Sequence, residues 1–219
     1  MGTEIDLLRN YPRAARDLER RDISKSPESQ QLARQFGKEY FDGDRSHGYG
    51  GFEYDSRFWE PVVPDIIEHF RLTDSSRILD VGCAKGFMLY DLLRVLPEAK
   101  VSGIDISEYA VDNAIPEVKD RIQIGNATDL PFEDGSFDVV ISINTIHNLN
   151  RDDCRRALSE IERVSSQGAF VTVDAYRNEV ERVRMEKWNL TALTMMSTDQ
   201  WKEFFSEAGY TGDYYWFIP

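Results

Sequence analysis

The spacing of apolar positions differs between two parts of the chain. From Arg77 onward, short apolar runs alternate with segments whose apolar residues recur every three or four positions, the pattern of buried strands and amphipathic helices. The predicted strands span residues 77–81, 100–104, 122–124, 137–143 and 168–173, and the predicted helices span 87–96, 108–113, 151–164 and 199–208. This alternation indicates an α/β fold with a parallel sheet, followed at 210–218 by an aromatic-rich strand or hairpin.

The first part of the chain carries many charged and aromatic residues and little strand signal. The elements predicted here are helices at 6–21, 28–41 and 61–70 and a glycine-rich loop at 41–52. We therefore expect an N-terminal helical cap or lid at residues 1–72 and a sheet domain at 73–219.

A glycine turn follows the first predicted strand, in the segment ILDVGCAKGF at 78–87. Glycines let a ligand approach the backbone, and the helix that follows offers free N–H groups. Asp105 ends the next strand, about twenty residues further on, where a carboxylate can accept both hydroxyls of a ribose. Together these features predict an adenosine-containing cofactor. The alternative is a glycine turn that serves only packing, with Asp105 capping a helix.

The nicotinamide pattern G-x-G-x-x-G fits poorly, because Ala84 and Phe87 stand where its second and third glycines belong. The pattern acidic-x-G-x-G-x-G fits at Asp80, Gly82 and Gly86. ILDVGCAKGF resembles motif I of class I S-adenosylmethionine (SAM)-dependent methyltransferases, and GIDIS resembles their second motif. The segment 124–149 resembles their third and fourth motifs. The resemblance covers roughly residues 72–215, and it is closest to the small-molecule group that includes quinone-pathway C-methyltransferases.

This resemblance implies a Rossmann-like methyltransferase sheet, mostly parallel with an antiparallel C-terminal strand. It implies SAM as cofactor and S-adenosylhomocysteine (SAH) as product. Asp80 would orient the glycine loop, Asp105 would hold the ribose, and Arg57 would pair with the SAM carboxylate. The other residues expected to line the cofactor are Gly82, Cys83, Ala84, Gly86, Ile106, Asn126, Ala127 and Asn144. We expect the ammonium of Lys85 to point into solvent or toward the acidic surface.

Methyl transfer is an in-line displacement that requires aligned reactants and excluded water. We expect the acceptor beyond the fourth and fifth predicted strands. His147 follows the fourth and is the candidate general base, the alternative being a histidine that caps a helix or contacts backbone. Asp174, after the fifth, is the second catalytic candidate. Tyr176 and Arg177 follow it as candidate acceptor contacts, Arg177 for an anionic group; the alternative is an ordinary solvated loop.

Aromatic residues of the first part are the remaining candidates. Tyr49 and Tyr54 are assigned to the acceptor site, where aromatic faces suit a sulfonium or a flat acceptor, although such residues also pack a cap onto a sheet. The segment 185–196 resembles the variable helical insert of these enzymes, with Trp188 and Met195 as candidate wall residues. Asp174 has no adjacent acidic partner, so no metal site is expected.

Composition narrows the partners and the location. The formal net charge of −13 disfavours nucleic acid as a partner. The chain has no apolar run of about 18 residues, and its first residues form no apolar signal segment, so we expect neither membrane association nor secretion. Two distant cysteines and three scattered histidines predict neither a disulfide nor a zinc site. We expect a cytoplasmic monomer or homodimer.

The sequence thus favours a SAM-dependent methyltransferase of a small polar metabolite, modified at oxygen. A loose resemblance to surface-polysaccharide and secondary-metabolite enzymes suggests a sugar-, phosphate- or nucleotide-linked acceptor, with Arg177 and Arg45 as anion contacts. The alternatives are N- or C-methylation, a non-catalytic SAM-binding module, and a nicotinamide oxidoreductase.

Overall fold

The computed structural model describes residues 2–13, 17–48 and 53–219. Within them, seven strands form one sheet in the order β3-β2-β1-β4-β5-β6, and β7 pairs with β5 on the same side as β6. The strands are β1 (Arg77–Val81), β2 (Lys100–Asp105), β3 (Ile122–Ile124), β4 (Phe137–Ile143), β5 (Ser165–Tyr176), β6 (Met196–Ser197) and β7 (Asp213–Phe217). The chain order reverses on the two sides of β1, and such a switch point is where open α/β sheets bind ligands.

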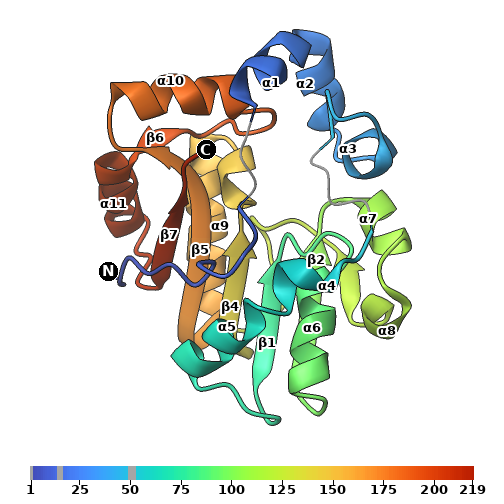
Figure 1. Ribbon diagram of the computed structural model, residues 1–219. Coiled ribbons are helices and arrows are strands. Elements are labelled where there is room, and N and C mark those ends of the chain that lie inside the picture. The colour runs from blue at the N-terminus through green and yellow to red at the C-terminus, as the bar shows by residue number, and fades with distance from the viewer. Residues whose placement is uncertain (1, 14–16, 49–52) are drawn as a thin grey trace.

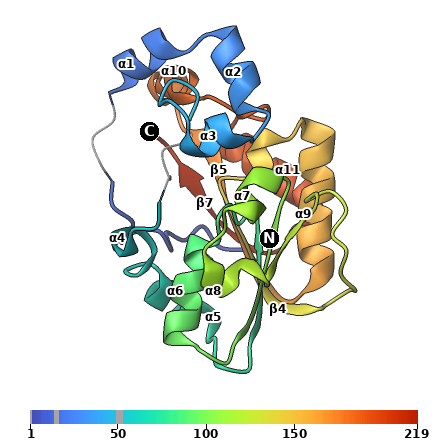
Figure 2. The same ribbon diagram turned by 90° about the vertical axis from the view of Figure 1, so that its right-hand side faces the viewer.

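Helices cover both faces of the sheet (Figures 1 and 2). One face packs against α4 (Ser56–Trp59), α5 (Val63–Phe70), α6 (Phe87–Val95), α7 (Glu108–Asp112) and α8 (Pro116–Lys119). The other face packs against α9 (Arg151–Val164) and α11 (Thr198–Glu207). Each face has its own apolar core, so the strands between them are buried on both sides, as their continuous apolar runs predict.

The last strand differs from its predicted direction. β7 lies parallel to β5, with Phe170 paired to Asp213 and Asp174 to Phe217, so the expected antiparallel C-terminal strand is wrong. The reason is the connection: α11 carries the chain back along the sheet, and a helical crossover returns a strand in the parallel direction. Residues 3–5 then cover the outer side of β7, where the Ile5 N–H donates to the Tyr214 carbonyl at 3.0 Å.

The first part of the chain divides into three segments. Residues 2–13 run beside the sheet, residues 18–48 form the cap helices α1 (Leu18–Ser24), α2 (Pro27–Ala33) and α3 (Lys38–Asp42), and α4 and α5 follow on the sheet. Figure 1 shows the cap helices beyond the carboxyl ends of the strands, with α1 beside α10 (Glu179–Trp188). The helix predicted at 61–70 is confirmed as α5.

The two other helices predicted in this part have different limits. The one predicted at 6–21 is wrong over its first half, because α1 begins only at Leu18. The one predicted at 28–41 is two helices, since Phe36 takes a left-handed conformation (φ 48°) and interrupts the helical hydrogen bonding before Gly37. In the described ranges, no helix is long and apolar enough to cross a bilayer.

The crossover helix α11 depends on its N-terminal cap. The Ser197 side chain accepts the Gln200 N–H at 3.2 Å, and the Gln200 side chain accepts the Ser197 N–H at 2.9 Å. We predict that Ser197→Ala lowers the free energy of unfolding by about 1 kcal/mol. The matched control is Ser206→Ala on the exposed side of α11, which should leave stability unchanged or slightly higher because alanine favours helix. Urea denaturation measures both, and equal stabilities of the two variants would contradict the assignment.

Candidate functional site

The glycine turn lies between β1 and α6 and is held close to its neighbours. Gly82 has φ 83° and Gly86 has φ 79°, a region that favours glycine. A Cβ atom added to Gly82 would lie 2.1 Å from the Thr145 hydroxyl oxygen, so only glycine fits there. Ala84 also takes a left-handed conformation (φ 51°), and its methyl group is accommodated at a modest conformational penalty. The turn therefore exposes backbone at the switch point of the sheet.

Two buried carboxylates lie beneath this turn. Asp105 accepts the N–H of Ala84 at 2.8 Å and that of Ser107 at 2.9 Å, and it is 8% exposed. Asp80 is 4% exposed, and burial together with the charge of Asp105 raises its pKa to about 8. Burial also raises the pKa of Asp105. Ionised carboxylates accept more hydrogen bonds than these contacts supply, so both side chains keep capacity for a ligand.

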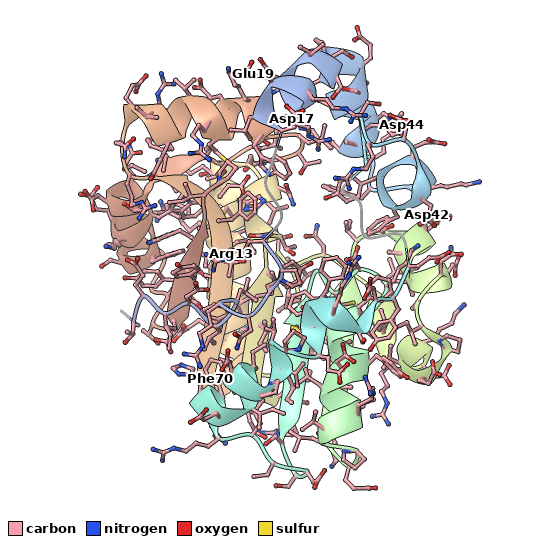
Figure 3. The ribbon with its side chains drawn as sticks, viewed as in Figure 1. Arg13, Asp17, Glu19, Asp42, Asp44 and Phe70 are labelled. Atoms are coloured by element: carbon pink, nitrogen blue, oxygen red, sulfur yellow. The ribbon has the colours of Figure 1, made fainter. Side chains whose placement is uncertain are left out.

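The nearest lysine in the sequence does not neutralise this pair. Lys85 is buried, so the expectation that its ammonium points into solvent is wrong, whereas its contact with the exposed Asp42 of α3 at 2.6 Å agrees with the alternative of an acidic surface. Asp42 also accepts the Tyr109 hydroxyl at 2.6 Å, and Figure 3 shows it where α3 meets α7. Across the described chain, no basic side chain pairs with Asp80 or Asp105. No cation of the described residues thus favours the ionised forms of Asp80 and Asp105 before a ligand binds.

Other residues predicted to line the cofactor lie at the ends of neighbouring strands. Ile106 is 54% exposed beside Asp105 and offers an apolar surface to a flat ring. Asn126 is exposed, and its side-chain oxygen accepts the Thr128 N–H at 3.0 Å. Asn144 takes a left-handed conformation (φ 52°) and joins β4 to β5 by accepting the Thr172 hydroxyl at 2.9 Å. The remaining two are Cys83, buried in the turn, and Ala127, which packs on the apolar core.

The structure gives Arg57 a different contact from the one expected. Its side chain is 72% exposed, pairs with Asp55 at 2.7 Å and lies over the Phe58 ring. Nothing in this arrangement directs the guanidinium toward the glycine turn.

His147 and Asp174 do lie together, at the ends of β4 and β5. The Asp174 N–H donates to His147 Nδ1 at 2.9 Å, and the Asp174 carboxylate is 3.7 Å from the same nitrogen. The Trp201 indole N–H donates to the Asp174 carbonyl at 2.9 Å. Burial lowers the pKa of His147, against the opposing effect of Asp174. The backbone of Asp174 is thus fixed from two sides while its carboxylate remains at the carboxyl edge.

The predicted acceptor contacts are more dispersed. The Tyr54 hydroxyl donates to Asp91 of α6 at 2.6 Å, and burial and this hydrogen bond raise the pKa of Tyr54 to about 12. Arg177 contacts Glu181 at the start of α10 through its backbone and its guanidinium. Tyr176 is half-buried at the end of β5. Tyr49 falls outside the described residues.

The cap helices contribute a residue that sequence reasoning missed. Tyr40 of α3 is hydrogen-bonded with Thr191, and burial raises its pKa to about 12, with further increases from the charges of Asp105 and Asp174. Its hydroxyl therefore lies within electrostatic range of the ends of both β2 and β5. Tyr40 lies within no motif of the sequence. It comes near the sheet because the cap helix α3 packs over the ends of the strands.

The cap is attached on both sides of the site. The Ser107 hydroxyl after β2 donates to the Phe36 carbonyl at 2.5 Å, and the Arg34 guanidinium donates to the Thr191 carbonyl at 3.3 Å. Together with the Lys85–Asp42 contact, these bonds hold α3 over the carboxyl edge of the sheet. The cap is therefore joined to the ends of β1 and β2 as well as to the segment that precedes β6.

Comparisons with known proteins agree with this geometry. Residues 79–173 match the sequence model of the family described as "Methyltransferase domain". A demethylmenaquinone methyltransferase of Symbiobacterium thermophilum is 36% identical over 126 residues, which are 53% of this chain and 49% of that protein. The O-methyltransferase rstn1 of Aspergillus nomiae is 30% identical over 121 residues, 52% of each chain. The chain thus spans about half the length of these curated relatives.

Solved structures show the same fold. The YcgJ protein of Bacillus subtilis superposes with a TM-score of 0.55 at 22% identity, covering 67% of this chain and 66% of that one. The cyclase SpnF gives a TM-score of 0.54 at 23% identity, covering 78% and 61%. Residues 79–173, which hold the glycine turn and its acidic partners, thus match a methyltransferase domain in sequence, and the parallel sheet around them has the fold of these solved structures.

Proposed function

We propose that the chain transfers a methyl group from SAM to a small polar acceptor. The observation that carries this proposal is the pair of buried carboxylates, Asp80 and Asp105, which no cation of the described residues neutralises. Such a pair favours a ligand that brings hydroxyl donors and positive charge. SAM brings both, and when bound it supplies an activated methyl group on its sulfonium. Asp105 would hold the ribose hydroxyls, and Ile106 would lie against the adenine.

We infer that the acceptor lies between the ends of β4 and β5 and the cap. Asp174 and Tyr40 bound this space, and the bonds that tie α3 to both sides would exclude water once the ligands are in place. Oxygen is the acceptor atom that we favour, because the Asp174 carboxylate can accept a hydroxyl hydrogen bond and take up the proton. Methylation at nitrogen or carbon is the alternative. An acceptor that carries phosphate or is linked to a sugar or nucleotide fits the proposal.

For His147 we propose a positioning role in place of the base role expected from the sequence. A histidine whose Nδ1 accepts a backbone N–H keeps its proton on Nε2 when neutral, so Nε2 is a donor and no acceptor nitrogen remains. Because burial lowers the pKa of His147, the neutral form prevails at physiological pH. The ring then fixes the backbone that carries the Asp174 carboxylate.

The cofactor assignment predicts binding of SAM and SAH that depends on Asp105. Asp105→Ala should weaken both by at least about a hundredfold, since it removes two hydroxyl acceptors and the support of the Ala84 N–H. Asp112→Ala, which removes an exposed carboxylate on the nearby α7, should bind like the native protein. Calorimetric titration measures these affinities, with NAD as a negative control. No binding of SAM or SAH by the native protein would refute the proposal.

The raised pKa of Asp80 predicts that SAM binding releases a proton. With a pKa of about 8, the ligand-free protein holds a proton on Asp80 near neutral pH. A cationic ligand favours the ionised carboxylate, so affinity should rise by up to about tenfold per pH unit below this pKa and level off above it. Calorimetry in two buffers of different ionisation enthalpy detects the released proton, and Asp80→Asn should abolish it. Equal binding heats in both buffers would contradict the prediction.

The raised pKa of Asp80 also makes the free energy of unfolding of the ligand-free protein depend on pH. A carboxyl whose folded-state pKa is raised binds its proton more tightly when folded, so its stabilising contribution is complete below the unfolded pKa near 4 and is lost as pH rises toward 8. The native protein should therefore lose stability over this interval relative to Asp80→Asn. Urea denaturation at a series of pH values measures the difference, and parallel curves for the two proteins would argue against a raised pKa.

The positioning role of His147 predicts its tautomer. The chain has three histidines, so each ring is resolvable in a long-range proton–nitrogen correlation spectrum. We expect one ring to remain neutral with its proton on Nε2 below the ordinary histidine pKa of about 6.5, and to be missing from the spectrum of His147→Gln. A His147 ring protonated on Nδ1 would restore the base role.

A further inference from the structure

A pair of arginines lies within the cap. Arg21, in the last turn of α1, donates from its guanidinium to the Arg45 carbonyl at 2.5 Å. Its Nε is buried and has no hydrogen-bond partner in the described parts of the chain. Its guanidinium carbon lies 5.5 Å from the centre of the Trp188 ring, at the end of α10. Burial and the nearby positive charge of Arg45 lower the pKa of Arg21. Arg21 is thus a partly buried charge, and a second positive charge, that of the exposed Arg45, lies near it.

This arrangement contrasts with the basic residues around it. Three basic side chains on α10 and beside it contact carboxylates: Lys187 contacts Glu19, Arg182 contacts Glu179 and Glu186, and Arg177 contacts Glu181. The chain carries an excess of acidic residues, with a net charge of −13. Yet within residues 17–48 and 53–219, no carboxylate pairs with Arg21 or Arg45. A partly buried charge without a counterion is unfavourable, so the pair is suited to an anion from outside the chain.

The position of Arg21 links it to the acceptor space. The Trp188 ring beside Arg21 lies 5.9 Å from the Phe217 ring, between ring centres, and Phe217 is paired with Asp174 in the register of β5 and β7. Trp188 ends the helix that follows β5, and Figures 1 and 2 both show α1 running beside α10 above the sheet. Arg21 therefore lies on the cap side of the sheet end that carries Asp174.

We propose that Arg21 and Arg45 bind an anionic group, a phosphate or carboxylate, of the methyl acceptor, beside the Trp188 ring. This inference rests on the proposed function and assigns the class of acceptor. Arginine is suited to the task because its planar guanidinium presents several N–H donors in a fork that matches the oxygens of phosphate and carboxylate. The buried Nε of Arg21 supplies a donor that the chain itself leaves unused.

The proposal is tested by anion binding to the full chain. Inorganic phosphate and malonate serve as probes, each titrated with and without saturating SAH at an ionic strength held constant with chloride. The native protein should bind at least one of them, and the preferred probe identifies the group. Arg21→Gln and Arg45→Gln should each weaken binding by at least tenfold. Arg20→Gln removes the same charge from an exposed neighbour on α1 and should bind like the native protein.

Three results would overturn the inference: no binding of either probe by the native protein, undiminished binding by Arg21→Gln and Arg45→Gln, or an equal loss in Arg20→Gln, which would indicate general charge attraction. SAH affinity, measured on every variant, reports folding and should not change. Arg45 is exposed, so we expect Arg45→Gln to fold. Anion binding can then still be tested with Arg45→Gln if Arg21→Gln fails to fold. Failure of the native protein to bind SAH would refute the proposed function separately, without bearing on the anion titration.

Discussion

The site depends on how closely the turn after β1 passes its neighbouring strands. Gly82 faces Thr145 after β4, and a Cβ added to Gly103 of β2 would lie 2.6 Å from the Cys83 sulfur in the turn. This close passage brings the Ala84 N–H within 2.8 Å of Asp105 and leaves Asp80 buried beside the same carboxylate. The steric fit of three strands thus creates the acidic site, and a larger residue at Gly82 would move the backbone that defines it.

The cap adds what the sheet lacks. The sheet edge provides carboxylates: Asp80 and Asp105, which we propose for the cofactor side, and Asp174, which we propose for the acceptor side. The cap provides the cations Arg21 and Arg45, and it is held in place by the contact of its Asp42 with Lys85 of the glycine turn. Arg21 lies beside Trp188 at the end of α10, whereas the acidic pair lies at the glycine turn. A cationic cofactor and an anionic acceptor would therefore be drawn to different ends of the site, which helps to orient one toward the other.

The sequence predicts the features whose signal lies within a short segment, and it does not predict those that depend on how distant segments pack together. The turn at Gly82 and Gly86 and the acid at Asp105 follow from strand–turn–helix spacing, which the parallel sheet enforces. The direction of β7 was missed although a helix had been predicted just before it; the crossover it forms requires a parallel strand. Arg57 and Arg177 were assigned by residue type, and each instead contacts a nearby carboxylate in its own segment, which is the less demanding arrangement for an exposed guanidinium.

The residues that the cap contributes to the site could not be predicted from the pattern of apolar and polar positions, for a physical reason. Tyr40 and Arg21 come from short helices and contact Thr191 and Trp188, and the periodicity of the sequence carries no sign of those contacts. An arginine in an exposed helix and one in a buried, unneutralised position look alike in sequence. What separates Arg21 from Arg20, its immediate neighbour, is the direction of one side chain: Arg21 turns inward to the Arg45 carbonyl and the Trp188 ring. In a chain so rich in carboxylates, leaving that charge without an acidic partner is the stronger sign that a ligand completes the site.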